Sequence, residues 1–129
     1  MFLKLIEKLA VMLNLNHKKL KAWQLAITLY KEILIIAPKL PREEQFNLIS
    51  QIKRAALSVS NNIAEGAARK SARERKRFYE IARSSAVEVD SCLEVILVAC
   101  YLEQSEITVV ENLVEQVFKL LSKMIDNTL

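Results

Sequence analysis

Lysine and arginine residues gather in one part of this chain and could bind phosphate groups. They lie between positions 51 and 84 and are Lys53, Arg54, Arg69, Lys70, Arg73, Arg75, Lys76, Arg77 and Arg83. Contacts from such side chains to phosphates do not depend on base sequence, and they weaken as salt rises. Tyr79, on the outward side of a predicted helix, offers a surface on which a base could stack. The alternative is a solvated helix face, because Glu74 and Glu80 dilute the charge.

Charge is unevenly distributed along the chain, although the formal net value is only +4. Residues 51–84 carry nine lysines and arginines against three glutamates, whereas residues 85–129 carry two lysines against eight acidic residues. Such asymmetry fits an anionic partner at one end of the molecule. It equally fits neighbouring subunits or helices whose opposite charges complement each other.

Two carboxylates, Glu65 and Glu88, fall near apolar helix faces. They could act as an acid–base pair, but no nucleophile or metal-binding group accompanies them in the sequence. Because buried charges are normally paired, the favoured interpretation is structural, with each carboxylate accepting from a buried arginine, serine or asparagine. Asn61 and Asn62 are likewise expected to form hydrogen bonds across helices.

The residue inventory excludes most catalytic and metal sites. Gly66 is the only glycine and His17 the only histidine, which rules out glycine-rich phosphate loops, serine triads and di-iron Glu-x-x-His pairs. Cys92 and Cys100 fall about 12 Å apart along one predicted helix, too far for a disulfide. We expect them to be buried thiols of a reduced, cytoplasmic protein. The sequence therefore predicts no enzyme activity, no cofactor, no metal and no small-molecule substrate.

The elements that must position these residues are helices, because the 129 residues include one glycine and two prolines. We predict helices over residues 18–37, from 40 to the glycine at 66, over 72–102 and from 105 onward. Short connections make successive helices antiparallel neighbours. The predicted fold class is thus all-α, an antiparallel up-down four-helix bundle over residues 17–129. A short amphipathic segment, residues 1–16, is expected to form an extra N-terminal helix.

The expected buried faces follow from apolar residues three and four positions apart. The first helix carries the stripe Trp23, Ile27, Tyr30 and Leu34, widened by Leu29, Ile33, Ile35 and Ile36. The third helix buries Phe78, Ile81, Ala82, Ser85, Val89, Cys92, Leu93 and Ile96. Between the second and third helices, Gly66 is expected to be a left-handed C-cap. Ser71 and Glu74 then fit a capping box.

A family resemblance is carried by residues 54–66, which read RAALSVSNNIAEG. Arg69, Phe78, residues 81–85 and Glu88 belong to the same pattern. This pattern resembles the signature of the four-helix-bundle proteins named after 23S rRNA intervening sequences. The resemblance spans residues 17–101, and Ser84 and Ser85 stand where the family usually has Gly-Ser. The first sixteen residues have no counterpart in it. The motif residues that it marks as structural are Asn62, Glu65, Gly66, Ser85 and Glu88.

The resemblance also implies a function. Relatives among the accessory proteins of diversity-generating retroelements form pentameric rings that bind nucleic acid and a reverse transcriptase. This chain would then be a homopentamer that binds RNA, such as rRNA, or DNA through the corner between the second and third helices. The predicted nucleic-acid-binding residues are Lys53, Arg54, Arg69, Lys70, Arg73, Lys76, Arg77 and Arg83. The alternative is a protein-interaction scaffold, for example for a reverse transcriptase, without nucleic-acid readout.

Self-assembly is also expected from the residues themselves. Apolar residues make up 52% of the chain, more than a single small bundle hides easily. Residues 95–102, VILVACYL, are apolar nearly all round, so a second covering surface must come from another subunit or from the N-terminal segment. That segment is too short and too charged to span a membrane, and it lacks signal-peptide features. Packing on the bundle is favoured over an in-plane membrane anchor, because its polar face is weakly charged.

Overall fold

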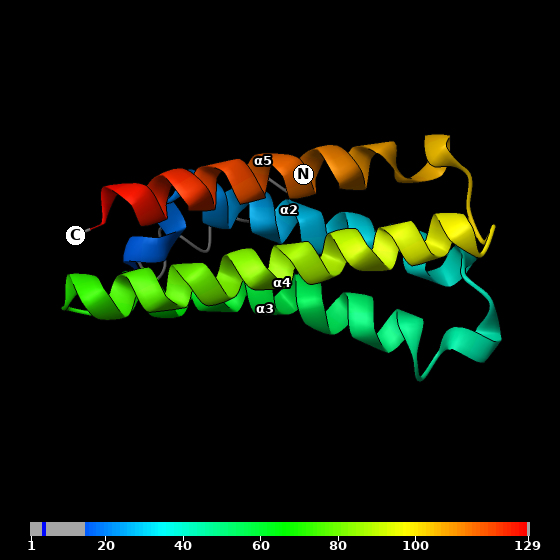
Figure 1. Ribbon diagram of the computed structural model, residues 1–129, viewed down its shortest axis with the longest axis horizontal. Coiled ribbons are helices and arrows are strands. Elements are labelled where there is room, and N and C mark those ends of the chain that lie inside the picture. The colour runs from blue at the N-terminus through cyan, green and yellow to red at the C-terminus, as the bar shows by residue number, and fades with distance from the viewer. Residues whose placement is uncertain (1–3, 5–14, 129) are drawn as a thin grey trace.

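The computed structural model describes residues 15–128 together with Lys4. Within these residues four α-helices run along one long axis, and no strand is present (Figure 1). They are α2 (Lys21–Ile36), α3 (Leu48–Ala68), α4 (Ala72–Val98) and α5 (Gln104–Asn127). Short 3₁₀ helices precede α2 and fill the α2–α3 connection: η1 (Asn16–Lys19), η2 (Ala37–Lys39) and η3 (Arg42–Glu44). The predicted all-helical bundle is confirmed, whereas the predicted N-terminal helix lies almost entirely outside the described residues.

The helices form a square in cross-section. Each helix packs against its neighbours in the chain, and α5 returns to pack against α2. The main pairs are therefore α2–α3, α3–α4, α4–α5 and α5–α2, so that the side formed by α2 and α3 lies opposite the side formed by α4 and α5. None of the helices in the described part of the chain is long and apolar enough to cross a membrane.

The buried face of α2 differs from the predicted stripe. Its buried residues are Ala22, Ala26 and three of the four residues predicted to widen the stripe, namely Leu29, Ile33 and Ile36. Leu34, by contrast, is 43% exposed, and Trp23, Ile27 and Tyr30 are only partly buried. The apolar surface of α2 is wide enough to contain two overlapping stripes. The stripe with small alanines faces inward, since it allows the neighbouring helices to approach closely.

The buried face of α4 is also rotated from the prediction. Tyr79 is buried, so the prediction of an outward stacking surface is wrong. Ile81 is 38% exposed and Phe78 is only partly buried. The remaining predicted core positions of α4 are buried, from Ala82 through Ile96. In the first two turns of α4, the aromatic ring that packs into the core is therefore that of residue 79 and not that of residue 78.

Gly66 explains why the ring lies there. It lies inside α3, is buried, and does not have a positive φ, so the predicted left-handed C-cap is wrong. A Cβ atom at position 66 would lie 2.7 Å from Cε1 of Tyr79 and 3.1 Å from Cβ of Phe78. Contacts that short do not occur without rearrangement. Glycine is thus required for close approach of α4 to α3, and not for its freedom at φ.

The left-handed residue is found instead after α4, at Cys100, with φ of 59°. The amide of Tyr101 donates to the carbonyl of Ile96, and the amide of Cys100 donates to that of Leu97, as in a Schellman-type helix end. This turn ends α4 at Val98, four residues before the predicted end. Cys92 is buried as predicted, but Cys100 is exposed and lies beyond the helix.

At the helix N-termini, the predicted role of Ser71 is confirmed. Its Oγ accepts a hydrogen bond from the amide of Glu74 at 3.1 Å. A complete capping box occurs at α5, where the side chains of Glu103 and Glu106 each accept from the other residue's amide. The start of α3 is less regular, because Pro41 and the η3 turn delay it to Leu48, eight residues after its predicted start.

A hydrogen bond across two connections closes this end of the bundle. The Tyr101 hydroxyl donates to a Glu44 carboxylate oxygen at 2.8 Å, and Asn47 Nδ2 donates to the other at 3.0 Å. The Tyr101 hydrogen bond is the main cause that lowers the pKa of Glu44 below its ordinary value. The same bond raises the pKa of Tyr101. The charged carboxylate therefore stabilises the fold above the ordinary carboxyl pKa, and this contribution is lost as the pH falls through the lowered pKa.

Tyr101→Phe is expected to lower the melting temperature near neutral pH and to have a smaller effect in acid below the lowered pKa of Glu44, where the carboxylate is protonated. The pKa of Glu44, followed by NMR of its carboxyl carbon, should rise towards the ordinary value. Tyr30→Phe is the control, since no hydrogen bond joins the Tyr30 hydroxyl to another described residue. Equal destabilisation at the two pH values would contradict this assignment.

Candidate nucleic-acid interface

Five basic residues lie at the connection between α3 and α4, and we call them the basic corner. They are Arg69, Lys70, Arg73, Lys76 and Arg77. All five are exposed, because the helix end and the first two turns of α4 point them away from the core. Arg73, Lys76 and Arg77 line an open hollow of about 680 Å³ together with Ser71, Glu74 and Glu80. The structure therefore brings most of the predicted nucleic-acid-binding residues onto one surface.

Two arginines have structural roles within this surface. Arg69 forms an ion pair with Glu65 at 2.8 Å, and its guanidinium lies 4.9 Å from the centre of the Phe78 ring. Arg75 donates to the backbone carbonyls of Arg69 and Lys70, so it holds the connection in place. These contacts order the turn without adding a charge that is free for a ligand.

The other four cations of the basic corner remain available. Within the described residues, the side chains of Lys70, Arg73, Lys76 and Arg77 form no ion pair and no hydrogen bond. Glu74 and Glu80 lie beside them but do not pair with them. The N-terminus of α4 adds a weak positive potential at the same place. The basic corner thus combines four unpaired positive charges with a fixed backbone.

Three predicted site residues do not join the basic corner. Arg83 is partly buried and turned towards α5, where its Nη1 donates to Ser122 Oγ at 3.2 Å and its guanidinium lies over Phe118. Lys53 and Arg54 line a groove between α2 and α3. The bonds Gln51–Glu88 and Ser58–Ser85 place them beside the middle of α4. At 1.5 Å per residue, that level is roughly 15–20 Å along the bundle from the basic corner.

The predicted motif residues form a polar link rather than a catalytic pair. Asn62 Nδ2 donates to the carbonyl and the hydroxyl of Ser58 in its own helix, and Ser58 Oγ lies 2.8 Å from Ser85 Oγ on α4. Ser85 is buried and also donates to the carbonyl of Ile81. At this level of the bundle the hydrogen bond between α3 and α4 is formed by the two serines, since Asn62 bonds within α3 and Asn61 is exposed. Sequence reasoning did not identify Ser58, although its spacing of four from Asn62 marks a pair on one helical face.

Glu65 and Glu88 are both exposed, so the expectation of buried carboxylates is wrong. Glu65 accepts from Arg69, and Glu88 accepts from Gln51 Nε2 at 3.1 Å. The two carboxylates sit near opposite ends of their helices' shared interface and make no contact. Each stabilises a local contact at the α3–α4 surface.

The titratable groups near the core are poorly suited to chemistry. Burial raises the pKa of the Cys92 thiol, and nearby Glu88 adds to that effect, so this thiol stays protonated near neutral pH. Burial also raises the pKa of Tyr79, which Arg75 partly opposes. Burial, with Lys18 nearby, lowers the pKa of His17, whose ring packs edge-on against Trp23. Among the described residues, no group of His, Cys, Asp or Glu side chains could hold a metal ion.

Comparisons with known proteins identify the fold and a family. The family model described as 23S rRNA-intervening sequence protein matches residues 18–123. A solved structure from Bacteroides thetaiotaomicron, of a protein with unknown function from the S23 ribosomal protein family, superposes with a TM-score of 0.76. It shares 22% sequence identity, and the match covers 82% of this chain and 99% of that chain. No protein with a curated functional description matches the chain.

Proposed function

We propose, from the premise that this chain belongs to the 23S rRNA-intervening sequence protein family, that it is a non-enzymatic bundle protein that binds RNA. The binding surface is the basic corner, and the ligand is the phosphate backbone of RNA, such as rRNA, or of another nucleic acid. The observation that carries the proposal is the set of four unpaired cations on a surface fixed by Arg69 and Arg75. Such a surface would contact phosphates without reading base sequence.

The proposal includes assembly into a homopentamer, as the resemblance to ring-forming relatives implies. Several basic corners around one ring would form a band of positive potential and would bind a long polyanion at several points at once. A cytoplasmic location is also part of the proposal, in keeping with two cysteines that form no disulfide.

Replacing Arg73 and Arg77 together by alanine is expected to weaken RNA binding and its dependence on salt. Each phosphate contact that is lost should lower the slope of log affinity against log salt by about 1 per subunit engaged. The loss should be similar for structured RNA, single-stranded RNA and duplex DNA, because phosphate contacts carry no sequence information. Binding is measured by fluorescence anisotropy across a salt series.

The control removes two positive charges outside the basic corner, with Lys31→Ala and Lys39→Ala on the α2 side of the bundle. The control variant should keep the wild-type slope within about half a unit. An unchanged slope for the Arg73 and Arg77 variant, or no binding by the wild type at low salt, would rule out the nucleic-acid proposal.

A second candidate is a protein-interaction scaffold, for example an accessory partner of a reverse transcriptase. The observation that favours it is exposed apolar surface, since Phe46 is 95% exposed and Val98 is 81% exposed. Residues of this type at a surface often mark protein contacts. A scaffold would keep its partner in high salt and would not be retained on immobilised RNA. A nucleic-acid-binding protein would be retained on immobilised RNA at low salt and released at high salt.

A further inference from the structure

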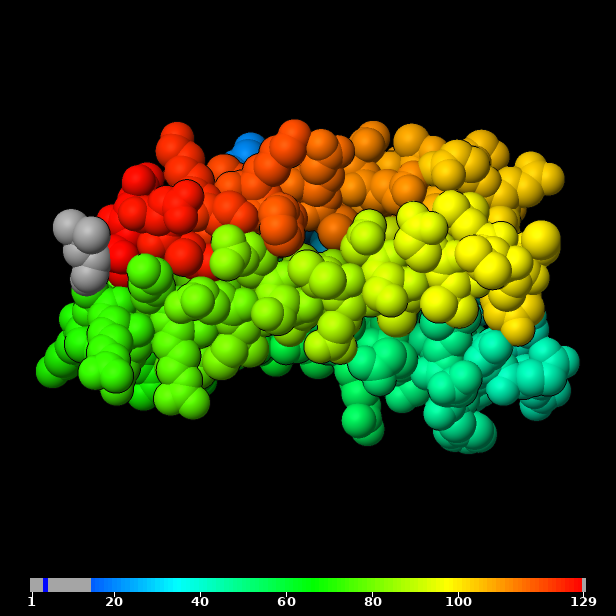
Figure 2. Space-filling view, viewed as in Figure 1, coloured from blue at the N-terminus to red at the C-terminus, as the bar shows by residue number. Residues whose placement is uncertain are grey.

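Two grooves of similar size lie on opposite sides of the bundle. One, between α4 and α5, has a volume of about 390 Å³, and we call it the acidic groove. The other, between α2 and α3, has a volume of about 380 Å³, and we call it the basic groove. Because the helices form a square, the α4–α5 side faces directly away from the α2–α3 side. The space-filling view shows the hollow between α4 and α5 near the middle of the molecule (Figure 2).

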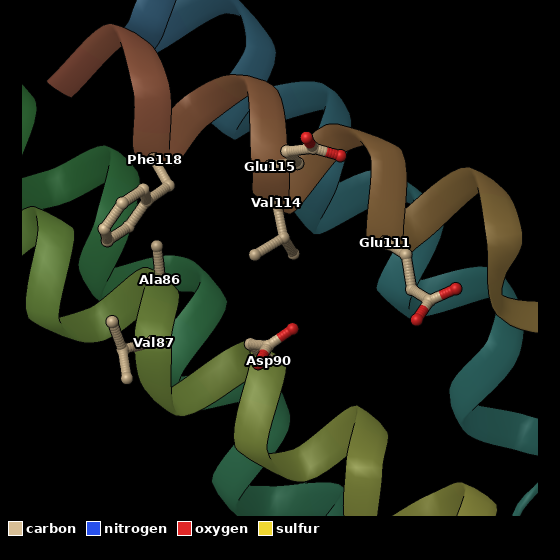
Figure 3. Close-up of a pocket in the computed structure, with 7 residues that line it drawn as sticks. All are labelled: Ala86, Val87, Asp90, Glu111, Val114, Glu115 and Phe118. Atoms are coloured by element: carbon tan, nitrogen blue, oxygen red, sulfur yellow. The ribbon is translucent and has the colours of Figure 1, made fainter. Parts of the chain in front are cut away.

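The acidic groove combines an apolar floor with three carboxylates. Figure 3 shows Val114 and Phe118 of α5 directed towards α4, with Asp90 and Glu111 at the opening between the helices. Val87 and Phe118 are 52% and 40% exposed. Glu115, the third carboxylate, pairs with Lys119 at 2.8 Å, and Glu111 accepts a hydrogen bond from the Gln104 side-chain amide, whereas Asp90 has no partner among the described residues. The surface is therefore suited to an apolar side chain flanked by positive charges.

The basic groove offers those features. Phe46 projects at its edge with 95% of its surface exposed, and Leu57 is 43% exposed. Lys53 and Arg54 line the same groove, and Arg42 lines an adjoining hollow that shares Lys53. None of these three cations forms an ion pair within the described part of the chain. An aromatic side chain exposed to this degree beside unpaired cations is typical of the centre of a protein interface.

We propose that the basic groove of one copy of this chain binds the acidic groove of the next. Phe46 enters the apolar floor near Val114 and Phe118, and Lys53 and Arg54 face the carboxylates on α5. The inference deepens the self-assembly in the proposed function and rests on it. Two acidic grooves facing each other would set carboxylate against carboxylate, so a symmetric contact of like grooves is disfavoured.

A contact between two different surfaces has a structural consequence. Each copy carries both grooves on opposite sides, so each copy contacts two neighbours, and the arrangement closes into a ring or continues as a filament. The basic corner lies roughly 15–20 Å along the bundle from Lys53 and Arg54 and stays exposed in such an assembly. It also gives Lys53 and Arg54 a role distinct from nucleic-acid contacts.

The test reverses the charge of one groove at a time. One variant carries Lys53→Glu and Arg54→Glu, and a second carries Glu111→Lys and Glu115→Lys. Each variant is expected to be a single chain of 14.8 kDa instead of the wild-type assembly. Combining all four substitutions in one chain should restore assembly, because the two grooves are again opposite in charge. Phe46→Ala alone should raise the dissociation constant at least tenfold. Masses are measured by light scattering after size exclusion and by sedimentation velocity, and helicity by circular dichroism.

The variant with Arg73→Ala and Arg77→Ala is the matched control, since it should assemble like the wild type while losing RNA affinity. That pairing separates the two proposals: a wild type that binds RNA as a single chain overturns the groove contact and the pentamer, but not the nucleic-acid role. A wild type that assembles but does not bind RNA overturns the nucleic-acid role only. Singly reversed variants that assemble like the wild type, or a fourfold variant that stays monomeric with native helicity, would also overturn the groove contact.

Discussion

Leu29→Ala is expected to lower the free energy of unfolding by about 3 kcal/mol, the largest effect of any single change considered for this chain. Leu29 lies on α2 with no exposed surface, in a cluster with Ile33, Ile52 and Ile96. Removing its three terminal carbons loses their transfer free energy and leaves a cavity that four packed helices cannot close. The measurement is urea unfolding followed by circular dichroism, with all variants at one chain concentration because the apparent stability of a self-associating chain depends on concentration.

Leu34→Ala is the matched control, because it makes the same chemical change five residues further along α2. Leu34 is 43% exposed, so its loss should lower the free energy of unfolding by less than about 1 kcal/mol. The comparison checks which of the two apolar stripes of α2 faces the core. Equal losses for the two variants would show that the orientation of α2 is wrong.

Gly66→Val is expected to lower the free energy of unfolding by about 2 kcal/mol through overpacking. The new Cβ would lie 2.7 Å and 2.9 Å from two carbons of the Tyr79 ring. That ring is buried between the helices and cannot swing away as a flexible side chain would. Valine gains a few tenths of a kcal/mol of helix propensity over glycine, which offsets only a small part of the loss. Ala68→Val, at an exposed position of the same helix, should be nearly neutral.

The cause can be isolated in a background that lacks the ring. In a Tyr79→Ala chain, Gly66→Val should lower the free energy of unfolding much less, because the two contacts with the ring are gone and only the 3.1 Å approach to Cβ of Phe78 remains. A left-handed glycine would instead make valine costly in both backgrounds. Gly66 and Tyr79 also flank the basic corner in sequence, so under the proposed nucleic-acid role the Gly66→Val chain should bind RNA more weakly than the wild type even under conditions in which both are folded.

The sequence alone determined the class of fold and the location of the basic corner. One glycine and two prolines, together with apolar residues at helical spacing, leave no alternative to helices. The cap at Ser71 was predictable because an N-cap depends on residues only three positions apart. The basic corner was predictable for the same reason, since its members lie within nine residues of one another and any tight connection brings them together.

The tertiary structure alone decided how each helix is rotated, because apolar stripes on α2 and α4 are wide enough to allow more than one inward face. Packing chose the face with Ala22 and Ala26 on α2, and it set Tyr79 against Gly66 instead of burying Phe78. The same rotations turned Arg83 towards Ser122. They also placed Lys53 on the side of the bundle opposite Glu111, since residues distant in sequence share a surface only through the packing of whole helices.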